Sequence, residues 1–520
     1  MKTTTRRNRT PAVPYPPPAP PAPAAPPPRP LRILFVSSEC APYAKCGGLG
    51  DVVSSLPKAL RAAGADVRTV LPLYASIDRQ RHALEPAGGL DVPCGNGERN
   101  GCAVWRTVAP GAIPTAFIEH DRYFARDGLY ADRNGDYGDN AFRFGLLCMA
   151  AAELCRARGW IPDVVHVHDW PTAMMPAMLD AWRKTGNSRG FERTGSVLTV
   201  HNQAYQGYSH PSVLPYLGLS APEYYTPDTF ESCGALNLLK GGWVYADAVT
   251  TVSPTYASEI RSEPAGAGLS EFVRRRGDTF QGILNGADYD VWDPERDPRI
   301  AASYGHNSLI GKILCKRDLQ RRLGLATDDT APLLGMVTRL ADQKGLGLLR
   351  DVLPWVLSEM PAVQLAVLGS GDPSAEDLLR DLQRRHPGRV AAVIGYSEDL
   401  SHRIYAGSDF FLMPSLFEPC GLAQMYALRY ASLPVVHAVG GLEDTVEQYN
   451  EGTGSGTGFK FYAATAQAFH DTIAWAVSTW YDRPTHMTKM RERAMAVRFD
   501  WTASAAQYLS LYRRVVSWRP

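Results

Sequence analysis

The chain has 520 residues, a length that suits two large domains or three small ones. It holds 54 Lys and Arg residues against 53 Asp and Glu, a net charge of +1, which gives no support to a nucleic-acid or membrane-surface binder. Apolar residues make up 45% of the chain, and no window approaches about 18 uninterrupted apolar residues, so we expect a globular protein without a membrane span.

Residues 1–30 differ from the rest of the chain. They hold twelve of the 40 prolines and five basic residues, but no acidic residue and no serine. Proline lacks the backbone N–H and fixes φ, so this run forms neither a helix nor a central strand. We expect a disordered or polyproline-II tail, either solvated or carrying a partner site. It has neither the apolar segment of a secretory signal nor the serine content of a transit peptide.

The nine cysteines include no C-x-x-C pair. This pattern indicates a reducing compartment, and it favours neither a disulfide scaffold nor a zinc site. We expect a cytoplasmic protein.

After the tail, short β-rich runs alternate with helical patterns. Residues 31–36 read LRILFV and predict a strand. Apolar positions from Leu49 to Ala63 then follow helical spacing, although Pro57 interrupts them and can kink a helix. Residues 67–71 predict a second strand. This β-loop-α-β unit implies parallel strands joined by a right-handed crossover.

The same alternation continues to the end of the chain. Such apolar strands suit sheets that are covered on both faces, so we predict an α/β protein with two doubly wound domains. The chain would cross into the second domain at about residues 285–330. Further strands are predicted at residues 164–168, 197–201, 248–252, 333–337, 364–368, 390–394, 410–413 and 435–437.

Polar and glycine-rich sequence follows most of these strands, where open α/β sheets bind their ligands. The glycines at 47, 48 and 50 fit neither a dinucleotide fingerprint nor a P-loop. They indicate either a tight turn or a backbone that approaches an anion beside Lys45.

Three histidines lie within or at the end of two predicted strands. His166 and His168 are two residues apart on one strand, so they point to the same face. Nothing nearby supplies a third ligand in a metal-binding pattern, which favours one buried histidine and one at the strand end. Taken alone, His201 is a polar residue in a loop.

Arg339 and Lys344 straddle a turn into a helix. They are either a solvated pair or a clamp on a diphosphate, where cations neutralise charge on a leaving group. Glu418 is, by itself, a surface carboxylate. A pair of carboxylates flanking a sugar would suggest glycoside hydrolysis, but the cations fit a phosphate leaving group better.

Taken in order, these segments resemble the bacterial glycogen synthases and plant starch synthases. Residues 45–51 read KCGGLGD after Ser38 and Glu39, and residues 166–170 read HVHDW. Residues 199–207 read TVHNQAYQG, residues 415–422 read SLFEPCGL, and residues 440–446 read GGLEDTV. Each motif is short, but the ordered set is specific, and it runs from about residue 31 to about residue 501.

The resemblance implies a GT-B fold, in which two Rossmann-like domains face a deep cleft. After the proline-rich tail at residues 1–30, which is extra to the family pattern, it implies an acceptor-side domain at 31–287, a donor-side domain at 288–497 and a returning C-terminal helix at 498–520. It also implies transfer of glucose from ADP-glucose to the 4-OH of an α-1,4-glucan, with retention of configuration and without a metal or other cofactor. The expected partners are therefore ADP-glucose and the glucan, with no nucleic acid and no membrane.

The resemblance also assigns site residues. Asp169 and His201 would line the sugar pocket, Arg339 and Lys344 would bind the diphosphate, and Glu418 would hold the glucose or support its positive charge. Tyr396 would stack on the base, and the backbone at Gly440 and Gly441 would bind phosphate or sugar. The remaining expected substrate-binding residues are Lys45, Gly48, Asp51, Asn285, Cys420, Gly421 and Leu422.

Cys46 departs from the family pattern, which usually has Thr or Val there. A small side chain is retained, so we expect function to survive, with the thiol either inert or redox-sensitive. Two alternatives stay open: a related transferase that uses UDP-glucose or another acceptor, and a catalytically silent glucan-binding protein.

Overall fold

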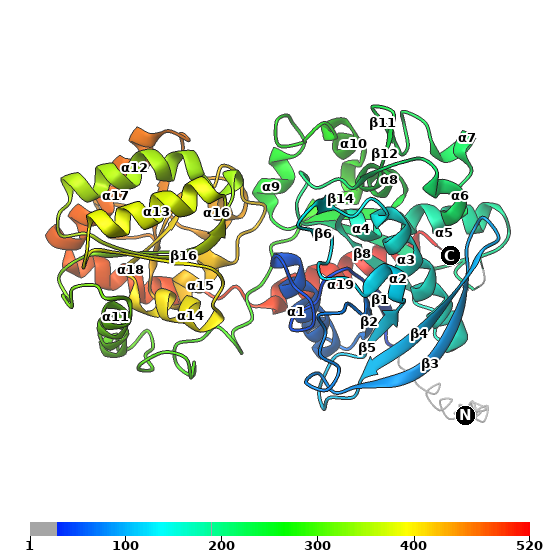
Figure 1. The fold of residues 1–520 in the computed structure, drawn as a ribbon, viewed down its shortest axis with the longest axis horizontal. Coiled ribbons are helices and arrows are strands. Elements are labelled where there is room, and N and C mark those ends of the chain that lie inside the picture. The colour runs from blue at the N-terminus through cyan, green and yellow to red at the C-terminus, as the bar shows by residue number, and fades with distance from the viewer. Residues whose placement is uncertain (1–28, 189, 520) are drawn as a thin grey trace, which may run out of the picture. The chain divides into compact units, whose positions relative to one another are not determined.

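The structure is a computed structural model that describes residues 29–188 and 190–519. The tail predicted at residues 1–30 therefore lies almost wholly outside the described residues. The rest forms two lobes, each built on its own sheet (Figure 1). The predicted strands are present in both, most of them within two residues of the expected bounds.

The first lobe contains a nine-stranded sheet. Seven strands run parallel, and two at one edge are antiparallel. Numbered by their order in the chain, the parallel strands lie in the order 3-2-1-4-5-6-7, so the order reverses between β1 and β8. The parallel strands are β5 (Thr115–Glu119), β2 (Asp66–Pro72), β1 (Arg32–Val36), β8 (Val164–His168), β9 (Gly195–Val200), β13 (Ala248–Thr251) and β14 (Phe280–Gly282).

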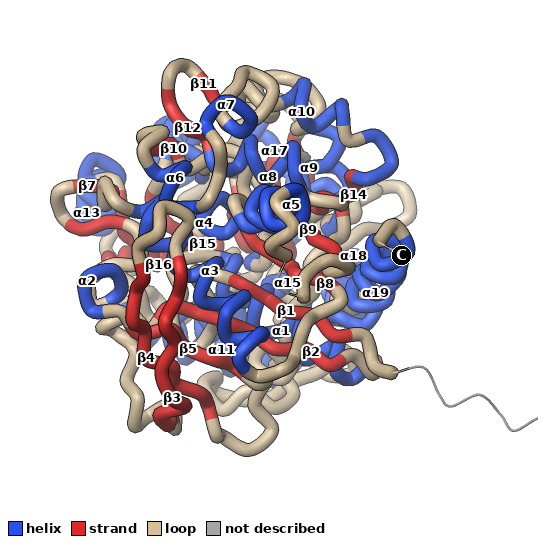
Figure 2. Tube along the Cα trace, turned by 90° about the vertical axis from the view of Figure 1, so that its right-hand side faces the viewer, coloured by secondary structure: helices blue, strands red, loops and turns tan. Residues whose placement is uncertain are grey.

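The antiparallel edge was absent from the prediction. It consists of β3 (Leu84–Pro93) and β4 (Arg99–Thr107), which form the long ribbon beside β5 in Figure 2. Two prolines and two glycines interrupt β3, and its register shifts between Pro86 and Gly89. A half-exposed, bulged strand of this kind lacks the apolar run that marked the buried strands.

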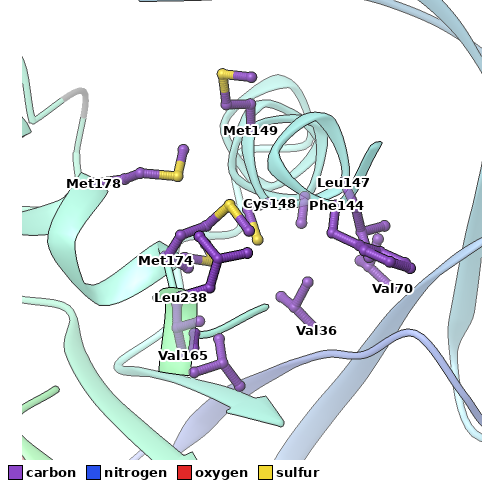
Figure 3. Packing of buried hydrophobic residues seen from close by; sticks show 14 of the residues in the cluster. Val36, Val70, Phe144, Leu147, Cys148, Met149, Val165, Met174, Met178 and Leu238 are labelled. Carbon is purple, nitrogen blue, oxygen red and sulfur yellow. The ribbon is translucent and has the colours of Figure 1, made fainter. Parts of the chain in front are cut away.

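Helices cover both faces of the first sheet. On one face, Phe144, Leu147 and Cys148 of α3 (Asn140–Ala157) point toward Val36 and Val70 (Figure 3). Burying a large apolar side chain of this kind contributes about 1.5–3 kcal/mol. The core of the first lobe thus lies directly beneath the strands that end at the cleft.

The other face carries α1 (Gly48–Ala62) and the C-terminal helix α19 (Trp501–Ser517). Val52 and Leu56 of α1 share a core with Trp501 and Tyr508 of α19. Pro57 is accommodated within α1. The last helix therefore packs on the first lobe, while the boundaries expected at residues 287 and 497 stay a prediction.

The second lobe contains a six-stranded, all-parallel sheet. Its strands have the Rossmann order 3-2-1-4-5-6, which reverses between β15 and β18. In sheet order they are β17 (Val390–Ile394), β16 (Gln364–Gly371), β15 (Leu333–Leu340), β18 (Phe410–Met413), β19 (Leu433–His437) and β20 (Phe459–Phe461).

Helices also sandwich this second sheet. In Figure 1, α12 (Leu346–Glu359) and α13 (Pro373–Arg385) lie on one face, and α11 (Ile310–Leu323), α14 (Glu398–Gly407) and α15 (Ala423–Arg429) lie on the other. The chain runs from the first sheet to the second between β14 and α11, and the domain crossing expected at about residues 285–330 stays a prediction.

In the part of the chain that is described, no helix combines the length and the apolar character that crossing a membrane requires.

Candidate functional site

A cavity of about 610 Å³ lies between the two lobes, at the carboxyl ends of their strands. It opens where the strand order of each sheet reverses, the point at which open α/β sheets bind ligands. We call the lining residues that fall between positions 39 and 285 the first-lobe wall, and those that fall between positions 336 and 423 the second-lobe wall. Twelve of the predicted site residues line it: Lys45, Gly48, Asp51, Asp169, His201, Asn285, Arg339, Lys344, Glu418, Cys420, Gly421 and Leu422.

Glu39 organises the glycine-rich loop on the first-lobe wall. This carboxylate is buried just beyond β1, and it accepts hydrogen bonds from the backbone N–H groups of Cys46 (2.8 Å) and Gly47 (3.1 Å). It also accepts one from the Tyr130 hydroxyl at 2.7 Å. Neither Glu39 nor Tyr130 is among the predicted site residues. They are 91 positions apart, so no local pattern could pair them.

The Cys46 thiol joins this cluster by donating to the second Glu39 oxygen at 2.9 Å. Desolvation of the sulfur and the adjacent Glu39 carboxylate raise the pKa of the thiol well above its usual range. A thiolate is the reactive form of cysteine, so this environment favours the inert reading of Cys46 over the redox-sensitive one.

Lys45 and Asp51 form an ion pair across the start of α1, with 2.7 Å between Nζ and Oδ1. An acidic residue in the first turn of a helix is favoured by the helix dipole. Burial raises the pKa of the Asp51 carboxyl despite this pairing. Two carboxylates thus hold Lys45 in position. Glu39 binds the backbone of the loop that follows Lys45, and Asp51 binds the Lys45 side chain.

Asp169 connects two neighbouring strand ends of the first lobe. It follows β8 in a left-handed conformation (φ +52°), which is uncommon for a residue other than glycine. Its carboxylate accepts the backbone N–H of His201 at 2.6 Å, which fixes the end of β9. Burial raises the pKa of Asp169 to about 7. Strain and a perturbed carboxyl group on a cavity wall are typical of functional positions.

His166, His168 and His201 form a chain of rings beneath this wall. The expectation of one buried and one strand-end histidine was incomplete, because His166 and His168 are both fully buried, with ring centroids 4.3 Å apart. His168 Nδ1 lies 3.1 Å from His201 Nε2. Burial lowers the pKa of His201 to about 3, so its ring is neutral over the physiological range.

The geometry of this chain indicates which nitrogens carry protons. His168 Nε2 is buried without a hydrogen-bond partner in the described part of the chain. A bare nitrogen is easier to leave unpaired than an N–H, so we assign the proton of His168 to Nδ1. His168 then donates to His201 Nε2, which leaves the proton of His201 on Nδ1. No described residue accepts from that Nδ1.

The second-lobe wall carries two cations, Arg339 and Lys344, and the carboxylate of Glu418. Lys344 Nζ lies 2.5 Å from Glu418 Oε2, and the Ser415 hydroxyl donates to the same oxygen at 2.9 Å. Gly345 makes this contact attainable, because it has φ +78° and a Cβ there would lie 2.1 Å from the Pro414 carbonyl oxygen. The turn after Lys344 can therefore pack closely against the loop that bears Glu418.

Arg339 differs from Lys344 in having no ion-pair partner among residues 29–188 and 190–519, although it lines the same wall. An unpaired guanidinium on a cavity wall favours an anionic ligand, because its charge is available for bidentate hydrogen bonds.

Cys420, Gly421 and Asn285 meet where the two walls join. Cys420 is buried, and burial raises the pKa of its thiol to about 12. Asn285 is buried beside it, with its Oδ1 unpartnered within the described residues. A buried amide oxygen without a partner at a cavity edge is a potential acceptor for a ligand hydroxyl.

Three predicted site residues lie outside the cavity lining. Tyr396 follows β17 and is 83% exposed. The N–H groups of Gly440 and Gly441 donate to Glu259 Oε1 (2.8 Å) and to the Glu418 carbonyl (3.0 Å). Any Cβ at these two glycines would overlap the 418–420 loop, so in this structure they have a packing role. Their expected contact with phosphate or sugar stays a prediction.

The lobes also touch beside the cavity. Thr255 of α9 (Pro254–Glu259) donates its backbone N–H and its hydroxyl to the Asp444 carboxylate, at 2.9 and 2.7 Å. Within the described residues, no three His, Cys, Asp or Glu side chains gather as a metal site would require.

Known proteins resemble this chain along most of its length. Residues 32–275 match the family model described as starch synthase catalytic domain, and residues 331–479 match that of glycosyl transferases group 1. The chain is 46% identical to glycogen synthase 1 of Geobacter sulfurreducens over 94% of its length and 96% of that protein. It is 42% identical to the glycogen synthase of Treponema denticola, and the match covers 93% of this chain and 98% of that protein.

Solved structures agree with these matches. The catalytic domain of starch synthase IV from Arabidopsis thaliana, bound to ADP and acarbose, superposes with a TM-score of 0.85 at 34% identity, covering 94% of this chain and all of that one. This match confirms the predicted GT-B fold. A sucrose-phosphate synthase from Thermosynechococcus elongatus shares the fold at 18% identity and a TM-score of 0.58. The superposition covers 94% of this chain and 99% of that one.

Proposed function

Because the chain belongs to the glycogen and starch synthase family of glycosyltransferases, we propose that it transfers glucose from ADP-glucose to the non-reducing 4-OH of an α-1,4-glucan with retention of configuration. The observation that carries this proposal is one cavity with different charges on its two sides. The second-lobe wall bears Lys344 and Arg339, which has no ion-pair partner among the described residues, and it faces a first-lobe wall that bears His201, Asp169 and the Lys45–Asp51 pair.

The leaving group in this reaction is a nucleoside diphosphate, which needs cations rather than a strong general acid. The unpaired Arg339 supplies one positive charge, and Lys344 supplies a second when the diphosphate displaces Glu418 from it. Cations preorganised where negative charge develops are among the largest contributions to catalysis. Glu418, once released, faces the positive charge that forms on the sugar.

The first-lobe wall would hold the glucose. A neutral His201 with its proton on Nδ1 is a hydrogen-bond donor for a sugar hydroxyl, and it cannot act as an acid near neutral pH because its pKa is about 3. The Asp169 carboxylate holds the His201 backbone in position and adds negative charge near the reacting carbon. Lys45 would complete the contacts to the donor phosphates.

The molecules bound to the Arabidopsis relative support this choice of substrates. That structure holds ADP and acarbose, a nucleotide and an oligosaccharide analogue. We infer ADP-glucose and a glucan for this chain by analogy with it, together with the charge distribution of the two walls.

Transfer of labelled glucose to glycogen tests the proposal, with ADP-glucose and UDP-glucose compared at equal concentration. We expect incorporation from ADP-glucose to be at least tenfold faster, about 1.4 kcal/mol in transition-state binding. Faster incorporation from UDP-glucose would overturn the choice of donor. No incorporation from either, with glycogen still bound, would indicate a silent glucan-binding protein.

A further inference from the structure

Tyr205 is an exposed aromatic residue on the first-lobe wall. Its side chain is 52% exposed and lines the cavity near His201. Its hydroxyl makes no hydrogen bond, and its ring no aromatic contact, with any residue of the described ranges. Single exposed tyrosines are common, so exposure alone says little.

The buried side chains on either side of Tyr205 hold it in place. Gln203 accepts a hydrogen bond from Trp243 Nε1 at 3.1 Å, and its backbone N–H donates to the Tyr256 hydroxyl at 3.0 Å. Gln206 donates to the Ala267 carbonyl at 2.7 Å and accepts from Asn237 at 2.6 Å. The segment is thus anchored two positions before the tyrosine and one after it, while the ring itself stays free.

Gly207 brings the same segment against another aromatic residue of the wall. It has φ +67°, and a Cβ there would lie 2.5 Å from the Trp170 ring. Only glycine allows this approach. The chain therefore passes closely over Trp170 at Gly207, and both Trp170 and Tyr205 line the cavity.

We propose that the Tyr205 ring is a stacking surface for a glucose unit of the acceptor glucan. This inference rests on the proposed function and adds a sugar-binding subsite to it. One face of a pyranose consists of C–H groups and packs on an aromatic ring, and a ring held by its neighbours loses little conformational entropy when a ligand binds.

The position of Tyr205 favours the acceptor over the nucleotide base. It belongs to the wall of Asp169 and His201, the side proposed to hold glucose, where the cation Lys45 is paired with Asp51. The two cations proposed to neutralise the leaving diphosphate, Arg339 and Lys344, are on the opposite wall.

Tyr208 provides a matched control. It lies three residues further along, is 59% exposed, and does not line the cavity. Its hydroxyl donates to Gln206 at 3.2 Å. Both tyrosines can be truncated without opening a cavity in the core, so both variants should fold and melt near the wild-type temperature.

The test combines kinetics with binding. For Tyr205→Ala we expect the KM for glycogen to rise about tenfold and the Kd for maltoheptaose, measured by calorimetry, to rise by a similar factor. The KM for ADP-glucose should stay within twofold. Tyr205→Phe retains the ring and should behave as wild type, as should Tyr208→Ala.

Unchanged glycogen KM and maltoheptaose Kd in Tyr205→Ala would overturn the proposal, as would a rise confined to the KM for ADP-glucose. Equal losses in Tyr205→Ala and Tyr208→Ala would also overturn it, because a general surface effect would then explain both. Failure of the proposed function is distinguishable, since the wild-type protein itself would then transfer no glucose.

Discussion

The two walls of the cavity use their carboxylates in different ways. On the first-lobe wall, Glu39 and Asp169 accept backbone N–H groups and thereby fix loops. On the second-lobe wall, Glu418 binds the Lys344 ammonium, and Arg339 has no anionic partner within the described chain. The first-lobe wall is therefore held mainly by its own hydrogen bonds, and its one cation, Lys45, is paired with Asp51. The second-lobe wall holds a guanidinium without an ion-pair partner in the described chain, beside a Lys344–Glu418 pair that a ligand can rearrange. The difference suits a reaction in which one side orients a sugar and the other stabilises a departing diphosphate.

Removing a cation from the second-lobe wall should have the largest effect. We expect Arg339→Ala and Lys344→Ala each to lower kcat by about 10²–10³-fold, the range seen when a transition-state contact is lost. Arg384→Ala, which removes an exposed arginine from a surface ion pair on α13, is the control and should leave kcat unchanged. Near-normal turnover in both cavity variants would remove the distinction between the walls.

The two cation variants should differ in stability. Lys344→Ala leaves the buried Glu418 carboxylate without its cation, so its melting temperature should fall. Arg339→Ala breaks no ion pair with a described residue and should melt as wild type does. Thermal unfolding of the two purified variants makes this comparison.

Loosening the first-lobe wall should have the next largest effect. Glu39→Gln replaces one acceptor oxygen with an NH₂ group that faces donors, so the loop bearing Lys45 should lose its fixed position. We expect kcat/KM for ADP-glucose to fall about tenfold, with a smaller loss for Tyr130→Phe, which removes a single donor. If Glu39→Gln has full activity, the loop is held by other contacts.

The pH dependence should report Asp169. With its pKa raised to about 7, this carboxyl group loses its charge as the pH falls below neutrality, so kcat should decline toward pH 6 and below. The folded state binds this proton more tightly than the unfolded chain does. The stability contributed by Asp169 is therefore full below about pH 4 and is lost as the pH rises through 7.

Asp169→Asn separates these two effects of pH. The variant should be nearly inactive, while its melting temperature should depend less steeply on pH between 4 and 7 than that of the wild type. An unchanged slope would mean that another group is responsible for the pH dependence.

Chelation should have the smallest effect. Arg339 and Lys344 supply the positive charge that a metal ion supplies in other transferases, so dialysis against EDTA should change kcat by less than twofold. Strong inhibition that added Mg²⁺ reverses would show that the second-lobe wall does not neutralise the diphosphate by itself.

The sequence predicted the parts of the fold that depend on local pattern. Residues 390–394 and 410–413 were predicted with the bounds that β17 and β18 have, because buried parallel strands are continuous apolar runs. The β3–β4 ribbon was not predicted, because its strands are half-exposed and β3 is interrupted by glycine and proline. Edge strands of this kind are stabilised by their partner rather than by their own sequence.

Residues of the candidate site could be predicted where a charged side chain follows soon after a predicted strand. Lys344 and Glu418 were expected near the cleft, and the structure adds that they bind each other. The hydrogen bond from Tyr130 to Glu39 could not be predicted, since only the folded chain brings these residues together. The same holds for Gly440, whose neighbours, Glu259 and the 418–420 loop, come from distant segments.

The central claim is that the second-lobe wall binds the diphosphate and the first-lobe wall binds the sugar. Calorimetric titration of Arg339→Ala with ADP and with maltoheptaose tests this claim most directly. The account predicts that the Kd for ADP rises at least tenfold while the Kd for maltoheptaose stays within twofold of the wild type. Weakened maltoheptaose binding with unchanged ADP binding would contradict it, because the unpaired guanidinium would then serve the glucan rather than the diphosphate.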